Sequence, residues 1–205
     1  MHNKQAEPEL YKRVLSACTN SCYGEDHSLL KLLIMEKMKK SSHPYPVITQ
    51  AQNNSTQWIG HLQSDPTDHF AGQTFACPAE GQLDNIQLYS AAVQNGGEVV
   101  MTLHEFDPRT KNWGPLICSS TLQVQKGDNA KWLRFGLPPV HLRKDVTYGF
   151  RVQTGNAMVG LGEAATGTRQ PFTFGHEWSG DSTNQRGYYY SYFSLAFKVE
   201  LCTHN

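Results

Sequence analysis

Runs in which apolar and polar residues alternate fill the chain from about Val47 onward, and they constrain the fold more than any other feature. Tyr148, Phe150 and Val152 alternate with polar or small residues, and the stretch EVVMTLHEF has the same period of two. This period places apolar side chains on one face of a β-strand. Turn-rich segments such as QKGDN and TGN separate the runs. About eight or nine short strands without helices between them predict an antiparallel β-sandwich of jelly-roll type.

Two turn signals help to divide this region into strands. The segment QNGG (residues 94–97) stands between LDNIQLYSAAV and EVVMTLHEF. Asn and Gly accept the positive φ angles of tight turns, so the segment predicts a hairpin that pairs these two strands. The segment LPPVHLRKD (residues 137–145) contains two adjacent prolines and predicts a break between strands.

The first part of the chain has a helical pattern. Apolar residues in PELYKRVLSACTN recur with a helical period, and DHSLLKLLIMEKMKK follows with Asp26 as a candidate N-cap. The proline-containing segment SSHPYP ends this pattern. We therefore predict two parts: an N-terminal α-helical hairpin over residues 1–45, packed on or beside the sandwich, and a β-sandwich domain over residues 46–205.

Composition and the lack of long apolar runs argue against nucleic-acid and membrane partners. Lys plus Arg and Asp plus Glu both number 18 in 205 residues, so the formal net charge is zero. A nucleic-acid-binding domain usually has a basic surplus or stripe, so no nucleic-acid partner is expected. No run approaches the roughly 18 apolar residues that a membrane helix needs, so no membrane partner is expected either. The N-terminus has no apolar signal core, and we expect a soluble, cytoplasmic protein.

The five cysteines point to the same compartment. Their odd number and wide spacing favour reduced thiols in a cytoplasm. Cys18 and Cys22 are four residues apart and would share one helix face, with His27 as the nearest further ligand for a metal. A structural zinc site needs four ligands, and the sequence has no second cysteine pair. Buried structural thiols are therefore the preferred interpretation.

Four segments, taken in order, show a likeness to a known group of domains. They are QTFACPAEGQLDNIQLYS, GGEVVMTLHEFDPRTKNWG, LRFGLPPVHLRKDVTYGFRVQTG and YFSLAFKVEL. Over about residues 70–201 this order resembles bacterial β-sandwich domains of the galactose-binding-like and carbohydrate-binding-module type. The resemblance implies a jelly-roll fold and a module that binds carbohydrate, while other domains of this type only pack or anchor. No catalytic motif carries over.

The last strand holds the main functional candidate. In GYYYSYFSLAFKVEL (residues 187–201), Lys198 and Glu200 should face water, so the odd-numbered positions should face the core. An unbroken strand would then send Tyr189 into the core. It would place three aromatic rings together on the opposite face: Tyr188, Tyr190 and Tyr192.

An exposed row of aromatic rings is costly unless it is used. Sugar rings stack on aromatic faces, and tyrosine hydroxyls can bond to sugar hydroxyls. The preceding loop adds polar and planar groups, so we predict a site for a carbohydrate or other small polar ligand formed by Glu177, Trp178, Asp181, Arg186, Tyr188, Tyr190 and Tyr192. The alternative is a structural or assembly protein in which the helices or another subunit of a homo-oligomer cover the tyrosine face.

Catalysis and cofactors receive less support. Glycoside hydrolysis needs two facing carboxylates, for which Glu163, Glu177 and Asp181 are the candidates of a fainter enzyme hypothesis. The sequence contains no G-x-S-x-G, H-E-x-x-H or P-loop motif. The segment HEFDPRTKNWG could place Glu105 and Asp107 around a structural Ca²⁺, but it lacks spaced acidic ligands, so an ordinary Asp-Pro turn is favoured. No cofactor, metal or catalytic residue is predicted.

Overall fold

The computed structural model describes residues 43–61 and 67–202. Contacts divide the chain into two units, Met1–Ser41 and Ser42–Asn205, and every described residue lies in the second. No described helix has the length and apolar character that a membrane span requires.

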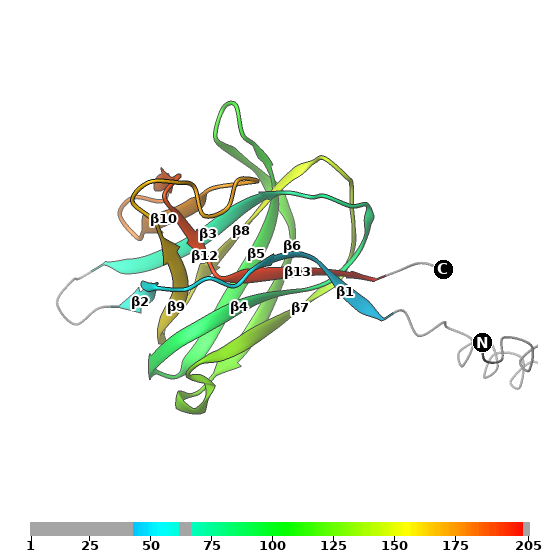
Figure 1. Ribbon diagram of the computed structural model, residues 1–205. Helices are drawn as coiled ribbons and strands as arrows, with labels where there is room; N and C mark the ends of the chain where they lie inside the picture. Colours follow the sequence, from blue (N-terminus) through cyan, green and yellow to red (C-terminus); the bar gives the residue numbers. More distant parts are fainter. Residues whose placement is uncertain (1–42, 62–66, 203–205) are drawn as a thin grey trace, which may run out of the picture. The chain divides into compact units, whose positions relative to one another are not determined.

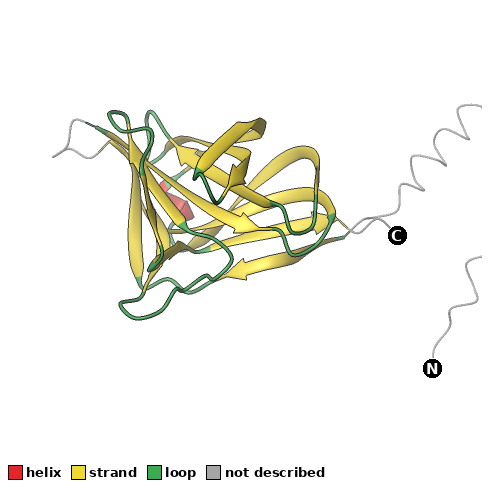
Figure 2. Cartoon of the chain, turned by 90° about the horizontal axis from the view of Figure 1, so that it is seen from above, coloured by secondary structure: helices red, strands yellow, loops and turns green. Residues whose placement is uncertain are grey.

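Antiparallel strands make up most of the described chain (Figure 2). The first seven are β1 (Pro44–Gln50), β2 (Ser55–His61), β3 (Asp68–Ala76), β4 (Gly81–Asn95), β5 (Gly97–Asp107), β6 (Asn112–Val124) and β7 (Lys131–Leu142). The others are β8 (Thr147–Gln153), β9 (Met158–Ala165), β10 (Glu177–Asp181), β11 (Tyr188–Tyr190), β12 (Phe193–Leu195) and β13 (Phe197–Cys202). A short 3-10 turn, η1 (Lys126–Asp128), lies between β6 and β7.

Hydrogen bonds join the described strands into one sheet that folds back on itself. The order along the sheet is β1-β13-β4-β9-β2-β3-β8-β5-β6. Figure 1 labels these strands. Strand β7 pairs with β4, and β10 adds to β3 and carries β11 on its other edge. Because β6 also contacts β7, the β6 end of the sheet approaches the β7 edge around a common core.

The alternation predicted for the central strands is confirmed. On β8, Tyr148, Phe150 and Val152 are buried, and Phe75 of β3 packs among them in the core. The Phe75 ring centroid lies 6.1 Å from Tyr148, 6.5 Å from Phe150 and 6.2 Å from Phe197 of β13. The core receives residues from β1 to β9, β12 and β13, whereas β10 and β11 lie outside it. These two strands are therefore free to build a surface feature.

The predicted hairpin at QNGG is wrong. The segment does join β4 to β5, but β4 pairs with β13, β9 and β7, while β5 pairs with β6 and β8. The turn is held by Asn156 instead, which accepts a bond from the Asn95 amide at its carbonyl (2.9 Å) and from the Glu98 backbone at its side chain (2.8 Å). A local turn signal cannot show this, because the choice of partner strand depends on contacts that are distant in sequence.

The strand break predicted at LPPVHLRKD is also misplaced. Strand β7 continues through Pro138 and Pro139 to Leu142, and its hydrogen-bonded partner among the described strands is β4. Proline has no N–H to donate, but an edge strand needs donors on one side only, and a register shift falls nearby between Leu83 and Asn85. The same reasoning explains β1, which begins at Pro44 and pairs with β13.

The predicted domain boundary therefore needs a correction. The predicted helical segment 1–45 includes Pro44 and Tyr45, yet both belong to β1. The remainder of the predicted helical hairpin, with Cys18, Cys22 and His27, lies outside the described residues. The three described cysteines, Cys77, Cys118 and Cys202, are free thiols, and the first two are buried.

Candidate functional site

The tyrosine-rich segment is not one unbroken strand. Residues 187–201 form β11, β12 and β13, with bends at residues 191 and 192 and an interruption at Ala196. Strand β11 pairs with β10, β12 pairs with β9, and β13 pairs with β1 and β4. Each change of partner strand turns the backbone, so alternation cannot be extended across the whole run. Ser194 and Ala196, predicted to lie opposite the core, are buried.

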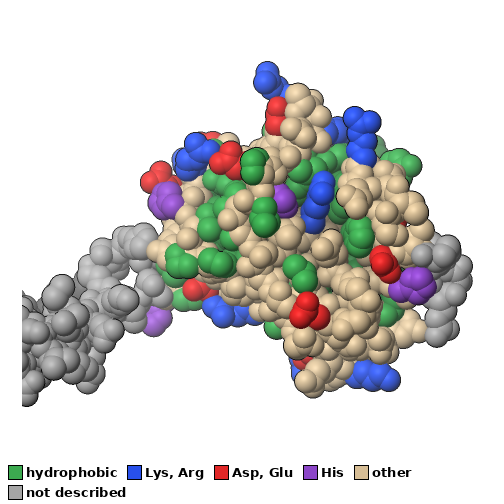
Figure 3. All heavy atoms as spheres, turned by 180° about the vertical axis from the view of Figure 1, so that it is seen from behind, with side chains coloured by type: hydrophobic (Ala, Val, Ile, Leu, Met, Phe, Trp, Pro, Cys, Tyr) green, Lys and Arg blue, Asp and Glu red, His purple; other side chains and the backbone are tan. Residues whose placement is uncertain are grey.

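Three tyrosines are exposed, as the outward-facing set predicts. The exposed fractions are 62% for Tyr188, 37% for Tyr190 and 55% for Tyr192. Tyr188 and Tyr190 alternate with Tyr189 on β11, whereas Tyr192 follows in a bend and owes its exposure to that bend. Two of the three thus share a strand face. On the face drawn in Figure 3, hydrophobic side chains, with tyrosine counted among them, lie in separate groups between charged ones.

Tyr189 does not join the core, which corrects the prediction for it. Its ring packs on Phe106 at a centroid distance of 5.5 Å, and its hydroxyl accepts a hydrogen bond from the Trp113 indole (2.6 Å). Trp113 in turn lies 5.7 Å from Trp178, edge to face. These four side chains form an aromatic cluster on the outer face of the sheet. Burial raises the pKa of Tyr189, so its hydroxyl stays protonated at neutral pH.

The aromatic cluster of Phe106, Trp113, Trp178 and Tyr189 holds an arginine. The Arg151 guanidinium lies 4.2 Å from the Trp113 ring centroid and 4.5 Å from that of Trp178, so it stacks between two indoles. Gly149 makes room for this arrangement, because a Cβ there would lie 2.6 Å from the Trp113 ring. Burial lowers the pKa of Arg151, and its buried Nε has no hydrogen-bond partner among the described residues.

Trp178 therefore does not stand on the exposed tyrosine face. Its side chain is 1% exposed, and its indole N–H donates to the Arg186 carbonyl (3.0 Å). Arg186 itself is exposed. Of the predicted ligand-binding groups, the structure places Trp178 and Glu177 inside the protein, where neither can reach a ligand on the surface without rearrangement.

Glu177 is one half of a buried carboxyl pair. It is 1% exposed and lies beside Glu163, which is 5% exposed. Burial raises the pKa of Glu177 to about 10, with a further contribution from the Glu163 carboxylate. Glu177 Oε2 has no hydrogen-bond partner within the described part of the chain. At neutral pH the carboxyl is therefore protonated and enclosed, which differs from the solvent-accessible acid that the enzyme hypothesis needs.

Asp181 is engaged in a turn. Its carboxylate accepts bonds from the Thr183 N–H (2.8 Å), the Thr183 hydroxyl (2.6 Å) and the Asn184 N–H (2.7 Å). These bonds lower the pKa of Asp181, the Thr183 hydroxyl most of all. Such a turn is a common role for aspartate in loops, and here it engages one of the two carboxylate oxygens, Oδ1.

A hollow that none of these residues lines lies on the outer face of β3, β5, β6 and β8. This sheet-face groove has a volume of about 540 Å³ and is lined by Asp68, Phe70, Glu98, Val100, Gln123, Gln153, Thr154, Gly155 and Asn156. Alternation places its strand residues there, because their neighbours Val99, Val124 and Val152 face the core. None of the candidate site residues named from the sequence lines this groove.

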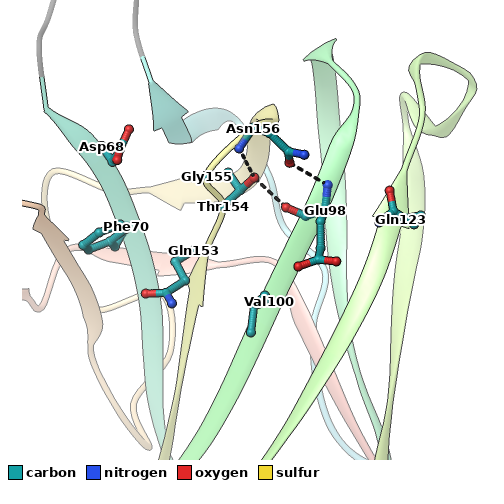
Figure 4. A pocket seen from close by; sticks show the side chains of 9 residues that line it. All are labelled: Asp68, Phe70, Glu98, Val100, Gln123, Gln153, Thr154, Gly155 and Asn156. Carbon is teal, nitrogen blue, oxygen red and sulfur yellow. Dashed lines mark hydrogen bonds between the residues drawn. The ribbon is translucent and has the colours of Figure 1, made fainter.

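Strand register brings the polar groups of the sheet-face groove together. Glu98 lies directly opposite Gln123 on β6, and Val100 lies opposite Gln153 on β8. Directly opposite side chains have Cβ atoms about 5 Å apart. Figure 4 shows Glu98, Val100 and Gln153 on the same side of the sheet, with Phe70 and Asp68 on the neighbouring strand β3.

One end of the sheet-face groove is held in shape by hydrogen bonds. The Thr154 hydroxyl donates to the Glu98 carbonyl (2.6 Å), and the Asn156 side chain accepts from the Glu98 N–H (2.8 Å). These bonds, drawn in Figure 4, pin the β8–β9 turn to the start of β5. The groove is thus largely preformed, as small-ligand sites usually are.

Metal binding finds no support in the described part of the chain. Its His, Cys, Asp and Glu side chains form no group of three or more that could hold an ion. Asp107, a candidate for Ca²⁺, instead bonds to the Arg109 N–H (2.9 Å) and the Thr110 hydroxyl (2.8 Å). This is the ordinary Asp-Pro turn that the sequence favours.

The chain matches no protein-family model, and none of the curated proteins matches it in sequence. Its function therefore has to be argued from the geometry of its own surface.

Proposed function

We propose that the protein is a non-catalytic module that binds a carbohydrate in the sheet-face groove. The observation that carries the proposal is the meeting of planar polar side chains with an aromatic ring in one hollow of about 540 Å³. Gln123, Gln153 and Glu98 offer amide and carboxylate groups, and Phe70 offers an apolar surface. Sugar hydroxyls need paired donors and acceptors, whereas sugar C–H faces need an aromatic partner.

The charges of the sheet-face groove narrow the ligand class. Among the described residues, Asp68 and Glu98 line the groove, and no lysine or arginine does. Two carboxylates repel phosphate and sulfate groups, so the ligand is a neutral or amino-bearing saccharide and not a nucleotide. The chain as a whole has no net charge to attract a polyanion.

The described strands form two layers in the fold that we propose. We infer a β-sandwich of jelly-roll, galactose-binding-like type, with β6, β5, β8, β3 and β10 in one layer and β7, β4, β13 and β1 in the other. Support comes from the antiparallel order, the common core and the contact between β6 and β7. The resemblance over residues 70–201 points the same way. The sheet-face groove then lies on the outer side of the first layer.

Removing ring and amide groups from the sheet-face groove should weaken sugar binding. We expect Phe70→Ala and Gln153→Ala each to weaken binding about tenfold, because one good polar or stacking contact contributes about 1–1.5 kcal/mol. A panel of soluble polysaccharides in native affinity gels, followed by calorimetry, would measure this on the full chain. Circular dichroism would confirm that both variants fold.

A double substitution on the tyrosine face distinguishes it from the sheet-face groove as the saccharide site. Tyr188→Ala with Tyr190→Ala should leave saccharide affinity unchanged, since neither lines the groove. If this double variant loses binding while Phe70→Ala retains it, the groove assignment fails and the predicted tyrosine platform takes its place. If no polysaccharide in the panel binds, the carbohydrate proposal itself fails.

The exposed tyrosines favour a second candidate function, which is self-assembly. Exposed fractions of 62% for Tyr188, 55% for Tyr192 and 66% for Phe174 are high for large rings. Tyrosine and phenylalanine are enriched at protein interfaces, where their rings act as anchors. A second copy of the chain is the simplest partner for such a surface.

Solution mass tests the assembly hypothesis. We expect the full chain to form a dimer or larger species at high concentration and Tyr188→Ser with Tyr192→Ser to shift it towards the monomer, because both rings would leave the interface. Sedimentation velocity over a concentration series measures the change. If the unsubstituted chain is monomeric at every concentration, the assembly hypothesis is wrong, regardless of the results of the sugar-binding assays.

A further inference from the structure

A second, smaller hollow lies between the β5–β6 hairpin and the segment that leads into β10. This Lys111 pocket has a volume of about 300 Å³ and is walled mainly by Phe106, Pro108, Lys111, Phe174, His176 and Tyr189. Its floor comes from β3 and β8, through Thr74 and Thr147. The two pockets share no lining residue.

The walls of the Lys111 pocket are held by packing and hydrogen bonds. Tyr189 packs on Phe106, and its hydroxyl is held by the Trp113 indole and reaches the Lys111 carbonyl (3.3 Å). On the other side, His176 exchanges hydrogen bonds with Thr74 of β3. Gly175 permits this close approach, because a Cβ there would overlap the Thr74 carbonyl oxygen.

The charge in the Lys111 pocket is positive and uncompensated. The Lys111 ammonium lies 5.4 Å from the Tyr189 ring centroid, at the pocket wall. None of the residues that line the pocket is acidic, and no carboxylate of the described residues pairs with this ammonium. Asp107, in the same loop, is engaged by Arg109 and Thr110. Lys111 also adopts a positive φ of 53°.

The aromatic side chains of the pocket indicate that the remainder of the ligand is apolar. Phe106 and Tyr189 present ring surfaces, and Phe174, which is 66% exposed, stands at the mouth. An exposed phenylalanine that lines the same pocket as a lysine suits a ligand that is apolar on its faces and anionic at one end. The pocket volume of about 300 Å³ is at the lower limit for ligand pockets, which favours a single ring.

We propose that the Lys111 pocket is a binding site for a small aromatic carboxylate, separate from the saccharide site. The ring would stack between Phe106, Tyr189 and Phe174, and the carboxylate would pair with the Lys111 ammonium. Cation-bearing rings are excluded by the same charge. The site does not depend on carbohydrate binding, because it uses none of the groups in the sheet-face groove.

Benzoate is the probe for this site, with calorimetry or ligand-observed NMR on the full chain as the readout. We expect saturable binding that Lys111→Gln weakens about tenfold, because the charged partner of the carboxylate is lost. Phe174→Ala should also weaken it several-fold, and the fold should tolerate this change because the ring is exposed. Lys126→Gln, which removes an exposed lysine of η1, is the matched control and should bind benzoate normally.

Neutral and cationic probes complete the test. Benzyl alcohol should bind weakly and lose affinity in Phe174→Ala but not in Lys111→Gln, and benzylamine should not bind. Benzoate binding that does not saturate, or that both variants leave unchanged, would overturn the proposal. Saccharide affinity should be the same in Lys111→Gln as in the unsubstituted protein, so the two sites can fail independently.

Discussion

Glu177→Gln is expected to make the protein more stable, and the gain should grow as the pH rises. The Glu177 side chain is 1% exposed, lies beside Glu163, and leaves one oxygen without a hydrogen-bond partner among the described residues. Its pKa of about 10 means that the folded protein must keep a proton that an unfolded glutamic acid releases near pH 4.3. Glutamine has the same shape, stays neutral at every pH, and its amide can donate to Glu163 as the protonated acid does.

The sign of this pH dependence follows from proton linkage. Below about pH 4.3 both states of the protein hold the proton, and Glu177 adds no pH dependence. Between that value and about pH 10 only the folded state holds it, so the free energy of unfolding falls as the pH rises. The slope is at most about 1.4 kcal/mol per pH unit for one proton. Stability that is present in acid is therefore lost progressively towards alkaline pH.

Urea unfolding of both proteins from pH 5 to pH 9 measures the effect. The difference between Glu177→Gln and the unsubstituted protein at each pH cancels the contributions of His104, His176 and the buried thiols, whose pKa values also shift. Glu98→Gln, at an exposed carboxylate, is the control. Parallel curves for Glu177→Gln and the unsubstituted protein would show that Glu177 does not hold the proton.

Trp178→Ala should destabilise the protein by about 3–5 kcal/mol, the usual cost of removing a large buried ring. The indole is 1% exposed, and the change removes its hydrogen bond to the Arg186 carbonyl as well. It also takes away one of the two rings that enclose the Arg151 guanidinium, which would then lie half-buried with less compensation. A loss of this size is a large fraction of the roughly 5–15 kcal/mol that stabilises a typical domain.

Chemical denaturation of Trp178→Ala and Tyr188→Ala shows which of the two rings is packed inside the protein and which is free to contact a ligand. Tyr188 is 62% exposed. Its removal should therefore change stability by no more than about 0.5 kcal/mol. Arg151→Met added to Trp178→Ala should recover part of the lost stability, because it removes the poorly enclosed charge. If Trp178→Ala were as stable as Tyr188→Ala, the indole would have to be accessible, and the ligand-binding role predicted for Trp178 would regain its force.

Alternation predicts side-chain direction well wherever one strand keeps the same partners throughout. Strands β5 and β8 bury Val99, Met101, Phe150 and Val152 as expected. The prediction weakens in residues 187–201, where the chain changes partner strand twice. Tyr189 illustrates the result, because its odd position predicts a place in the core, yet β11 pairs with β10 outside the core and turns this ring onto Phe106. The QNGG turn shows the same limit, since its residues describe a bend and not the strands that pair across it.

The pattern of residues along the chain is enough to establish the antiparallel β character, the core faces of the central strands and the outward direction of Tyr188 and Tyr190, because a two-residue period is a property of the local backbone. Which of the outward residues meet depends on the tertiary fold. Gln123 comes to lie opposite Glu98, Lys111 beside the Tyr189 ring and Glu163 beside Glu177 through pairings and turns that join distant segments. Each of these contacts depends on pairing between distant segments, which burial of the whole core stabilises. A local sequence pattern does not specify that pairing.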